Sequence, residues 1–286
     1  NTAPTDFETG QHVPEDRQLL IGDTTREVNG GGVDGDLDLG VTVAKRDLNE
    51  IQRAFDDLEM YDMDAVLLVA GLGGGTGAGA GAVVLEALTA IFEKPVYALG
   101  VLPADDEGPE PALNAARSLK TVVPTADNVV LFDNEVWHAT EDEEEGYERT
   151  NRELAKRVVT VFAGGEFDPA TVAENKLDPS DIMRTLDTGG VSTVGYAATE
   201  VATGGGGLLS WLRSDGDAEA DPTDAARIKR LVRAAVSSRL TLPCDVSSAD
   251  RALIVLSGPP ETFSRKGFEE ARYWLECAER FSLSRI

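Results

Sequence analysis

Residues 71–81 read GLGGGTGAGAG, which places seven glycines in eleven positions. The segment follows the apolar run AVLLVA (65–70), typical of a strand buried on both faces of a parallel sheet. It precedes an apolar helix expected to run through Phe92 and end before Pro95. Without Cβ atoms, backbone N–H groups can approach an anion closely, and the following helix N-terminus adds partial positive charge. Thr76 can donate a hydroxyl hydrogen bond to the same anion. We therefore predict a phosphate-binding segment rather than a tight turn or a flexible linker, because linkers do not join a buried strand to a buried helix.

Two common phosphate-binding loops fit this segment poorly. The P-loop pattern GxxxxGK[ST] is excluded because no lysine follows the glycines. The dinucleotide pattern GxGxx[GA] occurs in several registers, for instance at Gly73, Gly75 and Ala78, which makes it weakly specific. The acid expected about 20 residues further on to hold a ribose would be Glu93, which closes the predicted helix before the next strand begins. A Rossmann dehydrogenase is therefore a poor fit.

The apolar pattern around the segment predicts an α/β fold. Strands are expected at 65–70, 95–102 and 128–132, with a helix near 111–122 between the last two. This β-α-β-α-β order is typical of a parallel sheet. An acid-rich amphipathic helix is also expected at 41–59, before the first of these strands.

A second α/β unit is expected after a long helix at 147–162. Its helices are predicted at 179–186, 224–238 and 264–280, and its strands at 190–198 and 252–257. The stretch 202–221, rich in Gly and Asp, is expected to be a mobile surface loop.

The charge balance excludes one class of function. Fifty-one acidic residues against 26 basic ones give a formal net charge of −25. Such a surface repels nucleic acid, because affinity there comes from cationic side chains that neutralise phosphates. The acids are spread along the whole chain, which favours a protein adapted to molar salt over one with unusually acidic loops.

Cysteine usage and hydropathy point to a cytoplasmic protein. Cys244 and Cys277 lack a CxxC partner and are expected to be buried thiols rather than a disulfide or a zinc site. The sequence contains no run of about 18 apolar residues and no signal pattern at its start, so we expect no transmembrane segment.

Several motifs resemble those of the tubulin/FtsZ superfamily and follow in the same order along the chain. Residues 73–79 (GGGTGAG) match its signature GGGTG[TSA]G, 32–40 (GVDGDLDLG) resemble its γ-phosphate loop, and 132–136 (FDNEV) resemble the segment whose Asn meets the guanine base. Residues 177–182 (LDPSDI) resemble its catalytic loop NxDxxD, with Lys176 in place of the leading Asn, and 190–197 continue the pattern. The amino-acid sequences of 100–116 and of 240–244 (LTLPC) are most similar to those of the CetZ branch found in salt-loving archaea.

This resemblance implies a Rossmann-like, parallel-sheet GTP-binding domain at 1–146 and a long central helix at 147–165. A second, chorismate-mutase-like α/β domain that activates hydrolysis would occupy 166–286, with a flexible loop at 202–222. The implied nucleotide-binding residues are Gly32, Gly73, Gly74, Gly75, Thr76, Gly77, Glu107, Asn134, Tyr147 and Asn151. The implied cofactors are GTP or GDP and Mg²⁺, the metal being held through the nucleotide phosphates rather than by a protein cage.

The same resemblance implies hydrolysis between subunits. Asp178 and Asp181 would reach over the γ-phosphate of a neighbouring copy and orient the attacking water. Head-to-tail contact of this kind need not close, so it yields filaments of the protein with itself. A role in cell shape or motility follows from the CetZ likeness alone.

The residue types are compatible with these roles but also with simpler ones. A carboxamide offers both an acceptor and donors to guanine, which suits Asn134 and Asn151, and Tyr147 offers a ring face for base stacking. Asn134 could equally be a helix N-cap, Asn151 a solvated helix position, and Asp178 an N-cap before Pro179.

Two rival functions stay open. One is an FtsZ-like division GTPase. Localisation in a ring at midcell and arrest of division on deletion would favour it. The other is a non-polymerising nucleotide-binding enzyme, which the absence of light scattering with GTP, Mg²⁺ and molar KCl would favour. Partners at a membrane or in shape control are unknown.

The opening Asn1-Thr2-Ala3 resembles the superfamily's loop after its second strand. We therefore expect the sequence to be part of a longer protein that also carries the superfamily's first strand, first glycine loop and first helix. The 286 residues alone are expected to bind nucleotide weakly, and a micromolar GTP affinity in calorimetry would contradict this.

Overall fold

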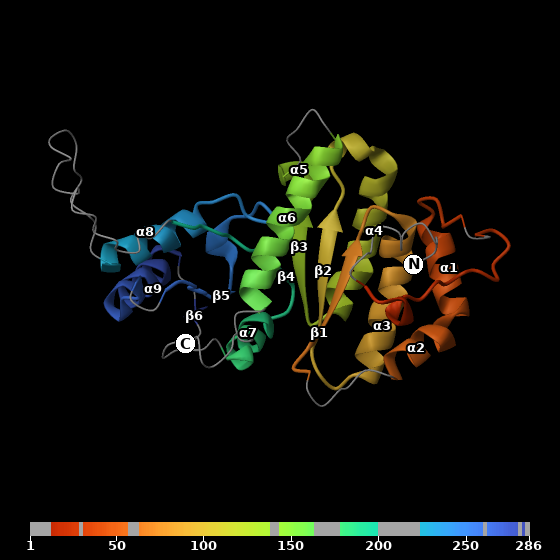
Figure 1. Cartoon of the computed structure of the whole chain (residues 1–286), viewed down its shortest axis with the longest axis horizontal. Coiled ribbons are helices and arrows are strands. Elements are labelled where there is room, and N and C mark those ends of the chain that lie inside the picture. The colour runs from red at the N-terminus through yellow and green to blue at the C-terminus, as the bar shows by residue number, and fades with distance from the viewer. Residues whose placement is uncertain are drawn as a thin grey trace. The chain divides into compact units, whose positions relative to one another are not determined.

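A computed structural model describes residues 13–28, 31–56, 63–137, 143–162, 178–199, 224–259, 262–279 and 282–283 (Figure 1). The chain divides into two compact units. The first comprises Asn1–Leu154, Leu186–Thr193 and Thr241–Pro243, and the second Ala155–Thr185, Val194–Leu240 and Cys244–Ile286.

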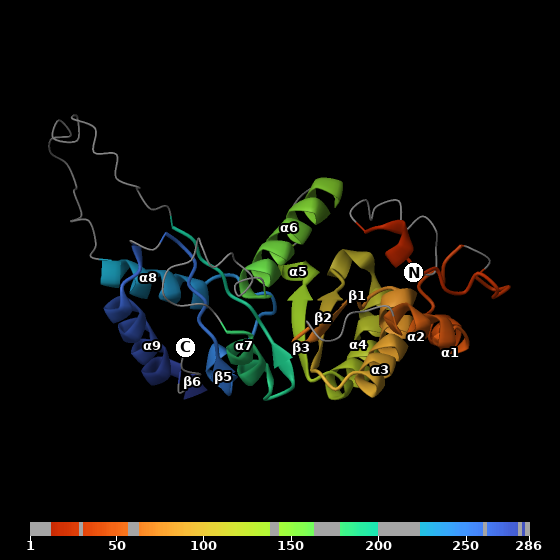
Figure 2. The ribbon, with the colours of Figure 1, turned by 60° about the horizontal axis from the view of Figure 1, so that its bottom comes forward.

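The first unit is built on a parallel sheet, as the sequence predicts. Its strands are β1 (Val66–Gly71), β2 (Val96–Leu102), β3 (Asn128–Asp133) and β4 (Val191–Ser192), in the order β1-β2-β3-β4. All three pairings are parallel. Figure 2 shows β1, β2 and β3 running in the same direction, so that their carboxyl ends share one edge.

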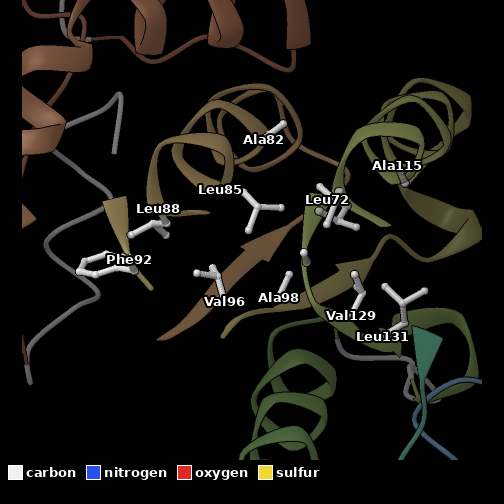
Figure 3. Close-up of a cluster of buried hydrophobic side chains, with 12 residues drawn as sticks. Leu72, Ala82, Leu85, Leu88, Phe92, Val96, Ala98, Ala115, Val129 and Leu131 are labelled. Carbon is white, nitrogen blue, oxygen red and sulfur yellow. The ribbon is translucent and has the colours of Figure 1, made fainter. Parts of the chain in front are cut away.

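Helices precede, connect and follow the strands of this sheet. Their bounds are η2 Glu15–Arg17, α1 Leu37–Arg46, α2 Leu48–Asp56, η4 Thr76–Ala80, α3 Gly81–Ile91, η5 Asp105–Glu107, α4 Pro109–Thr125, α5 Asn134–Trp137 and α6 Glu143–Phe162. The main core lies between the helices and one face of the sheet. Figure 3 shows Leu85 and Leu88 of α3 pointing toward Val96 and Ala98 of β2, and all four side chains are buried. This burial of apolar surface is what fixes α3 on the sheet.

The predicted helix at 41–59 is two helices, α1 and α2, which meet at Asp47. The Asp47 carboxylate accepts a hydrogen bond of 2.6 Å from the backbone N–H of Gly22. The Asp47 carbonyl accepts from the N–H groups of Glu50 and Ile51, which starts the second helix. An acid that bonds a distant loop can break a continuous amphipathic pattern, and periodicity alone does not reveal it.

β1 is less buried than the sequence predicts. Val69 is 59 % exposed, whereas Val129 and Phe132 of β3 are fully buried. Within the described residues β1 pairs only with β2.

The second unit is smaller in its described part. Its elements are α7 (Pro179–Leu186), α8 (Asp224–Val236), η7 (Val246–Ser248), β5 (Arg251–Ala252), α9 (Arg265–Glu279) and β6 (Ser282–Leu283). Helices α8 and α9 pack through Ile228, Val232 and Ala271. The close contact needs Gly267, because a Cβ there would lie 2.5 Å from the Cα of Ala225.

The strand expected at 190–198 in the second unit is wrong in length and in place. Only Val191–Ser192 forms a ladder, and it pairs with β3 in the sheet of the first unit. The strand expected at 252–257 is also shorter than predicted, because only Arg251–Ala252 forms a ladder, although Ile254 and Leu256 still pack against α8 and α9.

Cys244 is exposed, which corrects the expectation of a buried thiol. Partial desolvation of its thiol, followed by the charge of Asp245, still raises its pKa. The side chain of Cys277 lies outside the described residues. The predicted loop 202–221 lies outside the described residues, and no described helix is long and apolar enough to cross a membrane.

Candidate functional site

The glycine segment turns from β1 into a helix at the carboxyl edge of the sheet. Gly75 already has helical angles, and the chain continues through η4 into α3. The helix is therefore long, and its first amides stand at the end of β1, which is the geometry of an anion site. None of the seven glycines has a positive φ, so the glycines are not required by the backbone conformation.

Close packing against other backbone explains several of these glycines. A Cβ at Gly75 would lie 2.6 Å from the carbonyl oxygen of Asp36, and Cβ atoms at Gly77 and Gly79 would collide with the carbonyl oxygens of Gly71 and Leu37. Gly40 of α1 completes the contact, because its Cβ would collide with the carbonyl oxygen of Gly75. At Gly40 and Gly79, α1 and the η4 segment therefore approach backbone to backbone.

Gly74 differs from these glycines. A Cβ there would meet nothing within 4 Å, so protein packing does not require a glycine at this position. The space that a Cβ would occupy here is open, and the residue immediately precedes the helix that Gly75 begins. A ligand that approaches the backbone closely is a physical reason for glycine here.

A second loop, around Gly32, lies beside the glycine segment. It contains three positive φ angles, at Gly32 (81°), Asp34 (43°) and Gly35 (79°), and leads into α1. Asp36 caps α1 by accepting a 2.9 Å hydrogen bond from the Leu39 N–H. The close approach of Asp36 to Gly75 brings the end of this loop next to the glycine segment.

A side chain that the sequence analysis did not single out joins the two loops. Asn114 of α4 is buried, and its amide nitrogen donates to the carbonyl oxygens of Gly35 at 2.7 Å and of Gly73 at 3.0 Å. The sequence did contain a signal for it, because Asn114 is the polar residue in the alanine-rich segment PALNAA of a predicted helix. A polar side chain buried on the packed face of a helix needs hydrogen-bond partners.

Glu107 and Tyr147 are brought together. The Tyr147 hydroxyl donates to Glu107 Oε1 at 3.1 Å, and the same oxygen accepts a 2.8 Å hydrogen bond from the backbone N–H of Ala104. Glu107 lies in η5, directly after β2, and Tyr147 lies on α6. Both side chains are thus held near the carboxyl end of β2.

Asn134 is the first residue of α5 and is 9 % exposed. The capping role that the sequence left open for it belongs to its neighbour. Asp133 Oδ1 accepts a 3.1 Å hydrogen bond from the Glu135 N–H. Burial raises the pKa of Asp133, helped by the charges of Glu135 and Asp105 and opposed by the hydrogen bond from Glu135.

Asn151 lies one turn after Tyr147 on α6 and is exposed. Residues four apart share a helix face, so both can face one ligand. Thr150, between them, is buried and donates to the carbonyl oxygen of Trp137 at 3.5 Å. This contact ties α6 to the end of α5.

Asp178 and Asp181 belong to the second unit, whereas the residues above belong to the first. Asp178 Oδ1 accepts a 2.8 Å hydrogen bond from the Ser180 N–H, so it does cap α7. That bond and the Ser180 hydroxyl hold the pKa of Asp178 below its ordinary value, so the group is a carboxylate at neutral pH. Asp181 is buried and lies 3.7 Å from the Arg184 guanidinium. Lys176 lies outside the described residues.

Comparison with known families and proteins assigns the chain. The tubulin/FtsZ GTPase domain matches residues 1–142, and the C-terminal domain of tubulin-like CetZ matches residues 140–281. The "Tubulin-like protein CetZ3" of Haloferax volcanii is 48 % identical over 280 residues, which cover 96 % of this chain and 71 % of that protein.

Two solved structures from the same organism share the fold. "CetZ1 from Haloferax volcanii - GDP bound monomer" superposes with a TM-score of 0.84 at 40 % identity and covers 100 % of this chain and 77 % of its own. "CetZ2 from Haloferax volcanii - GTPgS bound protofilament" gives a TM-score of 0.81 at 37 % identity, over 100 % and 76 % of the two chains. With both halves matched by family and by fold, the chain belongs to the CetZ family of tubulin-like proteins within the tubulin/FtsZ superfamily.

Proposed function

We propose that this protein is a GTPase that polymerises head-to-tail into cytoskeletal filaments and acts in cell shape or motility. The observation that carries the proposal is the helix N-terminus at Gly75, placed at the carboxyl edge of a parallel sheet beside the Gly32 loop. In support, two relatives are described as a GDP-bound monomer and as a GTPγS-bound protofilament. The match to a CetZ C-terminal domain favours shape over the division role of an FtsZ-like protein.

The first unit would hold the nucleotide. The amides of Gly73–Gly77 and the Thr76 hydroxyl bind the α- and β-phosphates, and the Gly32 loop meets the γ-phosphate. Glu107 accepts hydrogen bonds from the ribose hydroxyls, which its position after β2 supports. At the base, Tyr147 stacks on the ring, and Asn134 and Asn151 pair with its edge.

Hydrolysis would be completed by Asp178 and Asp181 of a neighbouring copy. Asp178 is a carboxylate whose lowered pKa suits orientation of water better than removal of its proton. The oriented water oxygen forms a bond to the γ-phosphorus, the bond from that phosphorus to the β–γ bridging oxygen breaks, and GDP leaves. The inorganic phosphate that forms and the solvent take up the two protons of the attacking water.

Mg²⁺ fits this site as a partner of the phosphates rather than of the protein. Within the described residues no group of three or more His, Cys, Asp or Glu side chains could hold a metal ion. Mg²⁺ commonly keeps several waters and binds through substrate phosphates, so we propose that it is held here through the phosphates of GTP. When bound, it offsets the charge that two carboxylates add beside a triphosphate.

We propose the same functional division of the chain that the resemblance implies. A GTP-binding domain occupies 1–146, a central helix 147–165 and an activating domain 166–286 with its loop at 202–222. Helix α6, which spans Glu143–Phe162 and contributes to both compact units, supports a boundary on this helix.

The proposal is tested by GTP turnover as a function of protein concentration, in molar KCl with Mg²⁺ and the full-length protein. Turnover per subunit is expected to rise with concentration and to track light scattering, because each active site needs a neighbour. A rate per subunit that is constant over a hundredfold dilution, or absent turnover, would contradict the proposal.

Asp178→Ala sharpens the same assay. Nucleotide binding should be retained and turnover should fall at least about tenfold, as expected for loss of a water-positioning group. Asp245→Ala is the matched control, because Asp245 also accepts from a serine two residues on, at 3.0 Å from the Ser247 N–H, and also has a lowered pKa. Equal turnover in the two variants would refute the role given to Asp178.

A further inference from the structure

Asn114 makes a contact that links two segments far apart in the sequence. Its side chain is 4 % exposed on α4, and one amide nitrogen donates to both the Gly35 and the Gly73 carbonyl oxygens. A carboxamide has two N–H donors on that atom, so each carbonyl can receive its own hydrogen bond. With both acceptors being backbone atoms, the side chain fixes the separation of two main-chain segments.

Each of these segments is itself tightly held. Gly35 ends the stretch of positive φ angles before α1, so its carbonyl direction depends on an uncommon backbone conformation. Gly73 is enclosed by prolines, since a Cβ there would lie 3.1 Å from the Cβ atoms of Pro103 and Pro111. Asn114 therefore bonds two loops that have little freedom to adjust separately.

Helix α4 makes a second contact with the same region. Arg117, one turn after Asn114, pairs with Asp38 of α1 at 2.6 Å, and this hydrogen bond raises the Arg117 pKa. The pair is solvent-exposed and adds little stability by itself. It does place α1 and the loop before it against α4 at two points, of which only Asn114 is buried.

We propose that Asn114 is a positioning residue that sets the spacing between the Gly32–Asp36 loop and the Gly73–Gly77 loop, and that this spacing determines the preference for a nucleoside triphosphate over a diphosphate. This inference rests on the proposed function, in which only the first loop meets the γ-phosphate. A diphosphate contacts one loop, whereas a triphosphate must contact both. Loss of the Asn114 hydrogen bonds therefore weakens triphosphate binding selectively.

The test compares GTPγS and GDP binding to the full-length protein by calorimetry. In Asn114→Asp, which is isosteric, a carboxylate oxygen replaces the donor and faces two carbonyl oxygens. The affinity for GTPγS should fall at least about tenfold, and the affinity for GDP less than about threefold.

Asn128→Asp is the matched control. Asn128 is also buried, and its amide donates to the Leu186 and Gly189 carbonyl oxygens at 3.1 and 3.0 Å, but it lies at the amino end of β3. This variant should lower the melting temperature and leave the ratio of the two affinities unchanged. If either aspartate variant does not fold, the pair Asn114→Ala and Asn128→Ala replaces it with the same expectation.

The outcomes separate the two proposals. A wild-type protein that binds both nucleotides, with an unchanged affinity ratio in Asn114→Asp and Asn114→Ala, overturns the role of Asn114 alone. A ratio changed equally by the Asn128 variants also overturns it, because any buried amide would then suffice. A wild-type protein that binds neither nucleotide overturns the proposed function and this inference together.

Discussion

Tyr97 lies near the amino end of β2 with only 3 % of its surface exposed. Burial raises the pKa of its phenol to about 12, and the charges of Asp127 and Asp187 add to the shift. Asp127 is held in place by a 2.7 Å hydrogen bond from the Val96 N–H. The phenol therefore keeps its proton in the folded state well above the pH at which an unfolded chain loses it.

The Tyr97 contribution to stability should be complete below pH 10 and lost between about pH 10 and 12. In that window the unfolded state releases the proton while the folded state retains it, which costs up to about 3 kcal/mol. Urea unfolding at pH 9, 10 and 11 measures it, and Tyr97→Phe should remove this part of the slope. Parallel slopes in the two proteins would show that Tyr97 does not titrate on unfolding.

At the residue scale, the sequence predicts residue types better than contacts. It selects Glu107 and Tyr147 separately, and the structure brings them within hydrogen-bonding distance. It leaves the cap of α5 open, because Asp133 and Asn134 are adjacent and both can cap; only the backbone geometry assigns the bond to Asp133. Asn114 is missed because its partners are carbonyl groups, which have no sequence signature.

At the element scale, the contact between α1 and η4 gives two glycines of one motif different tolerance to an added methyl group. A Cβ at Gly79 would collide with the Leu37 carbonyl oxygen and lie 3.0 Å from the Val41 nitrogen, whereas a Cβ at Gly74 meets nothing within 4 Å. Gly79→Ala should therefore destabilise the protein by about 1–3 kcal/mol, as overpacking does, and Gly74→Ala should not.

Chemical denaturation of the two variants tests this difference. Gly74→Ala also serves as the control for adding a methyl group to the motif. Under the proposed function Gly74→Ala still weakens nucleotide binding, because its Cβ would project into space otherwise open to a ligand. Equal losses of stability in the two variants would contradict the packing explanation.

The type of an element was predictable where its apolar periodicity is strong. The boundaries of an element were not predictable where a hydrogen bond from a distant segment sets them. β2, β3 and α3 lie close to the predicted ranges because each buries a continuous apolar face. The division between α1 and α2 depends on the bond from Gly22 to Asp47, across 25 residues of sequence. The short β5 depends on pairing with β6, which its own sequence does not encode.

At the scale of the whole molecule, the net charge of −25 predicts a strong response to salt. Self-repulsion between spread acids is screened as the Debye length falls from about 30 Å at 0.01 M to about 3 Å at 1 M. The melting temperature should rise by about 10 °C over this range of KCl and then level off, because little repulsion is left to screen. Sucrose, which screens no charge, should not reproduce that curve; a melting temperature independent of KCl would contradict it.

The parallel sheet was predictable because alternating strand and helix patterns leave few arrangements for the chain. The contact proposed for Asp178 and Asp181 was not predictable from the residues alone. Under the proposed function it is made with a neighbouring copy, and the sequence of one chain does not encode how two copies align.

Gly40 stands outside the glycine-rich motif, yet it touches the motif's backbone through Gly75. Selection at these two positions therefore acts on one shared contact. A lineage that acquired a larger residue at Gly40 would still match GGGTG[TSA]G perfectly, while α1 would be pushed away from the glycine segment. Surveys of homologues that count the signature alone would miss such degenerate members, whereas inspection of Gly40 would expose them.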